Sequence, residues 1–449
     1  MEPIIVIGGG LAGSEAAWQL AQAHIPVLLY EMRPEITTGA HTTADLAELV
    51  CSNSLGSSIR NRPSGLLKEE LEALRSLLID CANKTSLPAG RALAVDRVAF
   101  ASLVSESIQN HPNITVIREE VRSLPTTPAV IATGPLTSSS LSSAIQKFTG
   151  SDYFYFYDAL SPIVEFSSIN MDIAFRASRY KFDPEDVGDY INCPMDEVEY
   201  MAFYNALLDA KAVPLPEIDA AISSGVQTSA PMFFEACLPI EAMAKRDPAA
   251  LTFGPMRPVG IHNPHKSEKP FAVIQLRQDN AAASLYNLVG FQTNLTFQEQ
   301  DRVLRMIPGL EQAEFTRYGQ MHRNTYINSP ALLSPTLQTH SREDLFFAGQ
   351  ITGVEGYVGN IASGLLAGLN ASRWLKRQET LTFPQETMIG ALHHYITTAN
   401  PVGFQPMKAN FGLLPPLPQI PQSKQERGYC YAKRALAALS TFMEGNDLK

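Results

Sequence analysis

The sequence predicts an α/β fold in which a Rossmann-like domain is interrupted by an inserted α/β domain. Three observations predict it. A strand–glycine loop–helix–strand pattern opens the chain, a similar pattern returns near residue 345, and the segment between them is rich in aromatic residues and in short alternating elements. The 449 residues also exceed what one hydrophobic core usually covers. We expect residues 1–165 and 336–449 to form the first domain, and residues 166–335 to form the insertion domain.

The first unit occupies the N-terminal residues. Ile4 to Ile7 form an apolar run that suits a buried parallel strand. Glycines follow within residues 8–13, and helix-forming residues continue from Ser14 to Ala23. A second apolar run extends from Val27 to Tyr30. The order and the lengths fit a strand–loop–helix–strand unit of a parallel sheet.

The remaining elements are expected from periodicity and from glycine and proline positions. The sequence predicts a polar, irregular stretch at 36–64, helices at 65–79 and 92–110, and strands at 114–121 and 129–134. The strand–glycine loop–helix pattern returns at 345–375, and a proline-rich link precedes a last amphipathic helix near 424–443.

Composition excludes several classes of protein. Hydrophobic residues make up 45% of the chain and charged residues 18%, which is ordinary for a soluble globular enzyme. No apolar run approaches the length of a membrane span. The start, MEPIIVIGGG, has no basic segment, so we expect no signal peptide and a cytoplasmic protein. A net charge of −10 argues against broad non-specific binding of nucleic acid, but clusters of Lys and Arg leave a local basic patch open beside the alternative of solvated helix faces.

The cysteine and histidine residues give no metal or disulfide pattern. Five cysteines are scattered and form no CxxC pair, which favours a reducing compartment. His262 and His265 have a metal-like spacing, but a proline lies between them and no acidic or thiol partner is near in sequence. We therefore expect no metal site.

The glycine loop has the spacing Gly8-x-Gly10-x-x-Gly13 between a strand and a helix. The first glycine permits a tight turn, the second lets a pyrophosphate approach the main chain, and the third lets helix and strand pack closely. The helix N-terminus adds free N–H groups. Glu31 stands where an acidic side chain accepts hydrogen bonds from ribose hydroxyls. A dinucleotide is predicted here, and a glycine turn without function is a poor alternative; the residues expected at the cofactor are Gly8, Gly9, Gly10, Leu11, Ala12, Gly13 and Glu31.

Two further segments favour FAD over NAD. AVIATG, residues 129–134, resembles the short strand that returns the chain to the cofactor in flavoproteins. LFFAGQITG, residues 345–353, resembles the late segment that brings a glycine turn to the flavin. The sequence has no second GxGxxG for a nicotinamide cofactor. We expect one FAD in a domain of the glutathione-reductase type, with Gly349, Gln350 and Gly353 beside it.

Many segments resemble one family, nearly from end to end and in order. Among them are CSNSLGS, GLLKEEL, YFYDALSPIV, INCPMDEVEYMAFYNAL, FFEACLPIEAMAKR, RMIPGLEQAEFTRYGQMHRNTYINSP and FFAGQITGVEGYVGNIASGLLAG. They are similar to segments of the folate- and FAD-dependent tRNA (uracil-5-)-methyltransferases. The resemblance implies methylation of C5 of a T-loop uridine of tRNA. Methylenetetrahydrofolate would give the carbon, and reduced FAD, replenished by NADPH or NADH, would give the electrons. The chain departs from the family pattern at Gly56, Ala236 and Gly359–Asn360.

Cys237 is the residue that the resemblance makes the nucleophile. A thiolate that adds to C6 of uracil loads negative charge onto C5, which then attacks an electrophilic methylene. Pro239 suits the first position of a helix, which would place Cys237 just before a helix N-terminus, where a thiolate is stabilised. The alternative is a small buried hydrophobic residue among Phe233, Phe234 and Leu238.

Cys51 and five other residues are further candidates. The resemblance suggests that Cys51 lies beside FAD and shapes the site or takes part in proton transfer; a loop thiol packed under the cofactor is an equal alternative. We expect His322, Arg323 and Asn324 to stack on the pterin of the folate or to form hydrogen bonds with it. Arg97 and Tyr357 are expected to line the same cavity. A turn between two strands would explain the HRNT segment equally well.

Three other functions remain open from the sequence alone. A wobble-uridine-modifying flavoprotein of tRNA shares the FAD loop and the folate link, but carries an extra C-terminal domain for which this chain is too short. An FAD oxidoreductase acting on a small metabolite would need no tRNA. A flavin-carrying RNA-binding protein would be indifferent to folate. We expect a monomer, because no segment of the sequence stands out as an interface.

Overall fold

The computed structural model describes residues 2–38, 40–150, 154–180, 188–214 and 238–448. Its first sheet contains only parallel strands, in the order β16-β7-β1-β2-β6. These strands are β1 (Ile4–Ile7), β2 (Val27–Tyr30), β6 (Ile114–Ile117), β7 (Ala129–Ile131) and β16 (Leu345–Phe347). Their residues are largely apolar and buried, as expected for strands covered on both faces.

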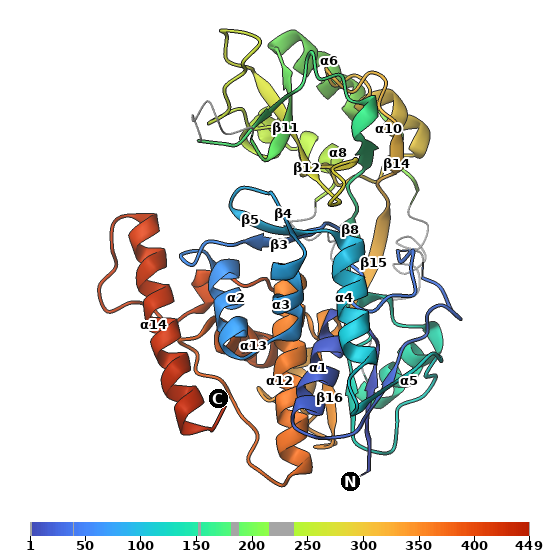
Figure 1. Cartoon of the computed structure of the whole chain (residues 1–449), viewed down its shortest axis with the longest axis vertical. Helices are drawn as coiled ribbons and strands as arrows, with labels where there is room; N and C mark the ends of the chain where they lie inside the picture. Colours follow the sequence, from blue (N-terminus) through green and yellow to red (C-terminus); the bar gives the residue numbers. More distant parts are fainter. Residues whose placement is uncertain (1, 39, 151–153, 181–187, 215–237, 449) are drawn as a thin grey trace.

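Helices from both ends of the sequence cover this sheet. Helix α1 (Leu11–Gln22) packs along α12 (Tyr357–Leu375), and Figure 1 shows the two side by side. The approach is close because α12 has glycines at the contact: a Cβ at Gly364 would meet the Ala12 carbonyl oxygen at 2.1 Å. The other helices of this part are α2 (Pro63–Ala73), α3 (Leu77–Lys84), α4 (Arg97–Gln109), α5 (Ser139–Thr149), α11 (Ser329–Leu332), α13 (Met388–Thr398) and α14 (Lys424–Gly445).

The second large sheet is antiparallel and lies in the upper part of Figure 1. Its order is β10-β11-β12-β13-β9-β14, from β9 (Ile163–Glu165), β10 (Phe175–Ala177), β11 (Tyr190–Met195), β12 (Ala272–Gln278), β13 (Leu285–Leu288) and β14 (Phe315–Arg317). Helices α6 (Glu197–Leu208), α8 (Ile240–Ala244), α9 (Ala250–Phe253) and α10 (Phe297–Leu304) belong to the same part. The predicted domain boundaries at 165 and 335 stay a prediction, although the strands of this sheet lie between residues 163 and 317.

Two smaller sheets complete the fold. Strands β8 (Phe154–Ala159) and β15 (Met321–Tyr326) pair antiparallel and run between the two parts (Figure 1). Strands β3 (Ser54–Ser57), β4 (Ser86–Leu87) and β5 (Ala92–Val95) form a three-stranded sheet beside α2 and α3. Single-turn 3-10 helices occur at Gly134–Leu136, Phe166–Ser168, Gln350–Thr352 and Phe411–Leu413.

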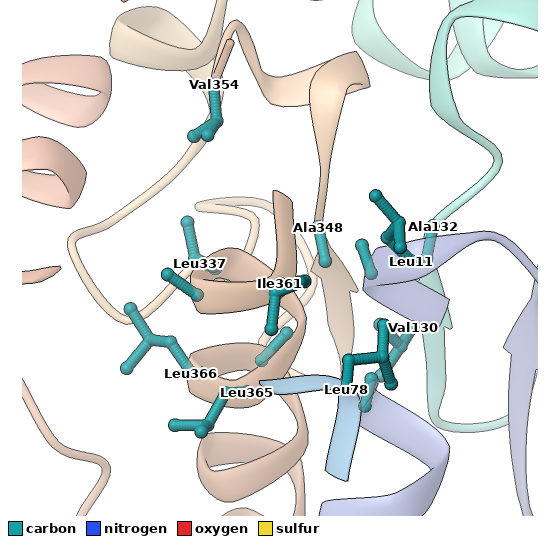
Figure 2. Packing of buried hydrophobic residues seen from close by; sticks show 14 of the residues in the cluster. Leu11, Leu78, Val130, Ala132, Leu337, Ala348, Val354, Ile361, Leu365 and Leu366 are labelled. Atoms are coloured by element: carbon teal, nitrogen blue, oxygen red, sulfur yellow. The ribbon is translucent and has the colours of Figure 1, made fainter. Parts of the chain in front are cut away.

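Each large sheet has its own hydrophobic core. The first core contains residues from both ends of the chain, and Figure 2 shows Val130 of β7 near Leu11 of α1, with Ile361 and Leu365 of α12 in the same packed region. The second core is formed by residues from Val164 to Ala313. In the part of the chain that the structure describes, no helix has the length and apolar character needed to cross a bilayer.

Two of the sequence predictions were wrong in detail. The helix predicted at 65–79 is two helices, because Arg75 has a φ of 60° and Ser76 then caps α3 by accepting from the Ile79 N–H. The helix predicted at 92–110 begins with a strand, β5, and becomes helical only after Asp96, whose side chain accepts from the Ala99 N–H. In both places a capping side chain, invisible to hydrophobic periodicity, sets the boundary.

Candidate functional site

The glycine loop joins β1 to α1 and has little room for side chains on its inner face. Gly8 has a φ of +101°, and a Cβ at Gly13 would lie 1.8 Å from the Gly8 carbonyl oxygen. A Cβ at Gly10, in contrast, would meet nothing within 4 Å. Gly8 and Gly13 therefore allow the turn and the close packing, and Gly10 leaves open space beside the main chain, as the dinucleotide prediction requires.

Glu31 closes the loop from the end of β2. One carboxylate oxygen accepts from the Gly9 N–H at 2.8 Å, and the other accepts from the Arg33 Nε at 2.9 Å. Burial alone would raise the pKa of the Glu31 carboxyl, but the hydrogen bonds and charge of Arg33 outweigh it and lower the pKa. The carboxylate is thus ionised and fixed, and its unused lone pairs remain available to ribose hydroxyls.

A cavity of about 1000 Å³ lies along this edge of the sheet. Of the residues predicted at the cofactor, it is lined by Gly8, Gly10, Leu11, Ala12, Glu31, Gly349 and Gln350. The other three, Gly9, Gly13 and Gly353, do not line it. Gly9 is bonded to Glu31, Gly13 packs on Gly8, and Gly353 has a φ of +83° against the ring of Phe404.

Sequence reasoning missed other residues of this cavity. They follow three strands of the parallel sheet: Met32 and Arg33 after β2, Glu119 to Val121 after β6, and Thr133 to Ser138 after β7. Because the carboxyl ends of parallel strands meet at one edge of a sheet, the strand ends were a signal that could have found them.

The cavity fits a dinucleotide on grounds independent of the motif. Open space faces the main chain at Gly10, and the helix α1 begins at the next residue. Asn360 of α12 also lines the cavity and is buried, and no hydrogen-bond partner for its side-chain oxygen is found among the described residues. A buried polar atom without a partner is rare in folded proteins, so a ligand atom is a reasonable partner for it.

A second cavity, of about 860 Å³, adjoins the first. The two share the residues Val50, Pro135, Leu136, Gln350, Tyr357 and Asn360. The second cavity is also lined by Cys51 and Asn324, both candidates from the sequence, and by Glu355 and Lys408. The structure therefore brings Cys51, Asn324 and Tyr357 together where two cavities meet.

Tyr357 connects Cys51 to the start of α12. Its hydroxyl oxygen accepts from the N–H groups of Cys51 at 2.8 Å and Ser52 at 3.1 Å. Burial, and then the neighbouring Cys51, raise the pKa of the Tyr357 hydroxyl, so the residue stays neutral. The hydroxyl is thus engaged by the Cys51 loop, while the residue as a whole lines both cavities.

Arg97 lies outside the lining of both cavities. Its guanidinium bonds the Asp279 carboxylate at 3.0 Å, and it donates to the carbonyl oxygens of Leu49 at 2.8 Å and Cys51 at 3.4 Å. Asp279 follows β12 of the second sheet, so Arg97 joins the two parts of the chain. A contact of Arg97 with the pterin stays a prediction.

Cys237, the predicted nucleophile, lies outside the described residues, and so does Ala236. The description resumes at Leu238, and Pro239 precedes the first residue of α8 instead of occupying it. Helix α8 has only five residues, so it gives little of the dipole on which the thiolate argument depended. The Ile240 N–H donates to the Gln292 carbonyl at 2.7 Å, and Gln292 lines the second cavity.

The remaining candidates are partly described. The backbones of His322 and Arg323 belong to β15, but their side chains lie outside the described part of the structure. The turn offered as an alternative for HRNT is wrong, because these residues form a strand paired with β8. Several basic residues that cluster in the sequence have partners: Arg302 with Glu299, Arg305 with Asp301, and Arg434 with the carbonyls of Pro415 and Pro416.

The sequence is similar to one protein family and, within it, to a group of enzymes that share one name. Residues 3–379 match the model of a family described as glucose inhibited division protein A. A protein of Anoxybacillus flavithermus named methylenetetrahydrofolate–tRNA-(uracil-5-)-methyltransferase TrmFO is 55% identical over 443 residues, which are 98% of this chain and 99% of that protein. Proteins of the same name from Bacillus subtilis, 54% identical with 98% of each chain covered, and Enterococcus faecalis, 53% identical with 99% of each covered, are also similar.

Solved structures show the same fold. The GidA protein of Aquifex aeolicus superposes with a TM-score of 0.69 in one crystal form and 0.68 in another, at 17% sequence identity. The first superposition covers 100% of this chain and 74% of that chain. At this identity the likeness concerns the fold, and it agrees with the predicted FAD-binding α/β architecture with an insertion.

Proposed function

Since the chain belongs to the glucose inhibited division protein A family and, within it, to the methylenetetrahydrofolate–tRNA-(uracil-5-)-methyltransferases, we propose that its two adjoining cavities form one methyl-transfer site. The enzyme methylates C5 of a uracil in tRNA and uses methylenetetrahydrofolate and FAD. The observation that carries the site assignment is the shared wall of the cavities, at Gln350, Tyr357 and Asn360, with Cys51 at the edge of the second.

The residues of the first cavity fit FAD. Gly8, Gly10 and the N-terminus of α1 suit a pyrophosphate, and the Glu31 carboxylate suits ribose hydroxyls. Gly349 and Gln350 would hold the part of the cofactor that reaches the second cavity. When bound, FAD supplies the hydride that reduces the transferred methylene to a methyl group. We propose that NADPH or NADH is the source of these electrons and that it binds without a dedicated nicotinamide-binding domain.

The second cavity would receive the uridine and the folate. In the proposed reaction, the Cys237 thiolate forms a bond to C6 of uracil, and the electron pair of the C5–C6 double bond moves to C5 and its carbonyl. C5 then bonds the methylene carbon of the folate. Loss of the C5 proton, with cleavage of the bond between the methylene and the folate nitrogen, releases tetrahydrofolate and leaves an exocyclic methylene on C5. Hydride addition to this methylene gives the methyl group, expels the Cys237 thiolate from C6 and restores the C5–C6 double bond. Cys51 lines the second cavity and is proposed to take part in proton transfer there.

The position of the target uridine in the T-loop is part of the proposal. A uridine in a loop is turned out of its stack at a cost of a few kcal/mol, less where the RNA is already irregular. With a net charge of −10, the enzyme would need a local basic surface, and tRNA affinity should fall steeply with salt. We propose a cytoplasmic enzyme, active as a monomer.

The test is isotope transfer. Purified protein is incubated with tRNA, NADPH and methylenetetrahydrofolate labelled at its methylene carbon, and the tRNA nucleosides are separated. Label in 5-methyluridine of the T-loop is the expected result. Label in the wobble nucleoside would favour the wobble-uridine activity, and FAD reduction without any label in RNA would favour a small-molecule oxidoreductase. Cys237→Ala is expected to keep FAD and lose label transfer.

A further inference from the structure

Two arginines bind the main chain around Cys51. Arg317, on β14 of the second sheet, donates from Nη2 to the Val50 carbonyl at 2.8 Å. Arg97, at the start of α4, donates to the Leu49 carbonyl at 2.8 Å and to the Cys51 carbonyl at 3.4 Å. Three consecutive carbonyl groups of the loop are thus bonded to guanidinium groups that belong to different parts of the chain.

A third arginine fixes the end of the same loop. Arg277, on β12, donates from Nε to the Asn53 side-chain oxygen at 2.8 Å. The Asn53 amide donates in turn to the carbonyls of Val95 at 3.0 Å and Gln278 at 2.9 Å. With the Tyr357 hydroxyl on the N–H groups of Cys51 and Ser52, every residue from 49 to 53 makes at least one hydrogen bond to a side chain outside the loop.

Among the described residues, positive charge is in excess at this place. Three guanidinium groups gather at the loop, and the geometry gives one ion pair within this part of the chain, between Arg97 and Asp279. The groups whose charges act on these arginines come from several elements: Asp279 after β12, Tyr190 of β11, Tyr357 of α12 and Cys51 itself, while Glu355 and Lys408 lie further along the second cavity.

Like charges at short range are costly unless an anion relieves them. Burial lowers the pKa of Arg317, and the charge of Arg97 lowers it further, while the ionised Cys51 would act in the opposite direction on both. Arg277 responds to Cys51 in the same direction. A thiolate at Cys51 is therefore the group that would compensate the excess positive charge.

We propose that Arg97 and Arg317 are positioning residues for Cys51, which hold its loop at the edge of the second cavity with two positive charges beside the sulfur. The inference rests on the proposed function only in so far as Cys51 takes part in the reaction. Because Arg317 and Asp279 belong to the second sheet, docking of the insertion onto the first domain sets both the place and the charge state of the thiol.

A purely structural role would predict the same contacts but a different response of the thiol. If the arginines only join the two parts of the chain, removing one should change stability and leave the ionisation of Cys51 where it was. If they act on the thiol, removing a positive charge should make the thiolate harder to form. The pH dependence of thiol reactivity separates the two roles.

The experiment measures alkylation of Cys51 by iodoacetamide in the FAD-loaded full-length protein between about pH 6 and about pH 10, because only the thiolate reacts. The Cys51 peptide is quantified by mass spectrometry. Variants are Arg317→Met, Arg317→Lys and the control Arg179→Met. Arg179 also donates to two carbonyls, of Arg257 and Val259, but makes no contact with the loop.

Arg317→Met should raise the pH of half-maximal alkylation by about one unit, Arg317→Lys should restore most of the shift, and Arg179→Met should leave it unchanged. An unchanged midpoint in a folded, FAD-containing Arg317→Met protein would overturn the proposal. If that variant does not fold, Asp279→Asn serves instead. It removes a negative charge and should lower the midpoint, and an unchanged midpoint there would also overturn the proposal.

These outcomes are independent of the activity itself. Label transfer to tRNA is measured on the same proteins. Wild-type protein without label transfer would contradict the proposed function, whether or not the alkylation midpoint moves with Arg317. A shifted midpoint together with reduced kcat and an unchanged KM for tRNA is the result expected when both proposals hold.

Discussion

The glycine loop and the Cys51 loop border the same pair of cavities but are held in different ways. The Gly9 N–H finds its partner, Glu31, 22 positions along the chain, at the end of the neighbouring strand. The Cys51 N–H donates to the hydroxyl of Tyr357, which lies 306 positions further along the chain. The Val50 carbonyl accepts from Arg317, at a separation of 267 positions. The first loop is determined by local backbone geometry, and the second by side chains that meet only after both parts of the chain have folded.

This difference determines how each loop responds to mutation. In the glycine loop, a side chain added at a glycine should cause a steric clash and weaken cofactor binding. A loop held by distant side chains should fail through loss of charge or hydrogen bonds, with effects on the thiol and little effect on the cofactor. The predictions below test this separation, beginning with the largest expected effect.

Removal of the Cys51 thiol should have the largest effect on activity and almost none on FAD. Cys51→Ala should lower label transfer to tRNA roughly a hundredfold or more, the range of acid–base and covalent catalysts. The flavin spectrum should stay the same, because Cys51 lines the second cavity and not the first. Cys430→Ala, which removes a partly exposed thiol on α14, is the control. Full turnover in Cys51→Ala would leave the thiol a packing role only.

Gly10→Ala should weaken FAD binding at the glycine loop without unfolding the protein. A Cβ at this position meets nothing within 4 Å, so the protein should fold with an unchanged melting temperature. The methyl group would occupy the space proposed for the pyrophosphate, and FAD affinity should fall about tenfold or more. Equilibrium binding of FAD to the apoprotein measures the change. Gly445→Ala, equally free of contacts, is the control, and unchanged FAD affinity in Gly10→Ala would place the pyrophosphate elsewhere.

Glu31→Gln should weaken FAD binding less than Gly10→Ala does. It should also change how the stability of the protein depends on pH. A charged hydrogen bond is worth about 1.5–3 kcal/mol, so affinity should fall roughly tenfold to a hundredfold. The folded-state pKa of Glu31 is lowered, so its contribution to stability is present above the unfolded pKa and is lost as the pH falls through the folded value. The variant should therefore lose less stability in acid than the wild type. Glu69→Gln, a surface position, is the control.

Lys68 gives the smallest predicted effect and concerns β3, the strand that follows the Cys51 loop. Its ammonium donates to the carbonyls of Leu55 at 2.9 Å and Gly56 at 3.2 Å. Burial lowers the pKa of Lys68 from 10.5 to about 8. Between these values the unfolded chain binds the proton and the folded chain does not, so stability should rise with pH by about 1.4 kcal/mol per unit.

Denaturant unfolding at several alkaline pH values tests this sign. Lys68→Met should remove the rise, whereas Lys84→Met, at an exposed i,i+4 pair with Asp80, should keep it. A wild-type stability that falls through the same pH range by as much as that of Lys68→Met would contradict the assignment. The sequence could not have given this expectation, because the contacts of Lys68 with the carbonyls of Leu55 and Gly56 depend on how α2 packs on β3.

The sequence predicted what depends on local pattern. The strands Ile4–Ile7 and Val27–Tyr30, the glycine turn and the acidic residue after the second strand follow from apolar runs and glycine spacing. The break at Arg75 and the strand at Ala92–Val95 did not, because a capping serine and pairing with β3 and β4 override helical periodicity. Strand ends at Met32, Glu119 and Thr133 were visible in the sequence but needed the strand order to be placed at the cavity.

The Cys51 loop shows where such reasoning stops. Arg97 was expected near the pterin because its segment resembles the family. The pterin contact stays a prediction, and the structure adds that the Arg97 guanidinium contacts Asp279 and two loop carbonyls. Arg317 was not among the residues predicted at the site. A partner 267 residues away cannot be found from spacing, because it depends on how the second sheet docks.

The central claim is that the two cavities form a single site, with the cofactor in the first and Cys51 at the edge of the second. The most direct test is an experimental structure with FAD bound. The account predicts a flavin ring at the wall shared by the cavities, within about 4 Å of Tyr357 or Asn360, and a hydrogen bond to the Asn360 side chain. A flavin ring that points away from this wall, with Cys51 separated from it by protein, would contradict the account.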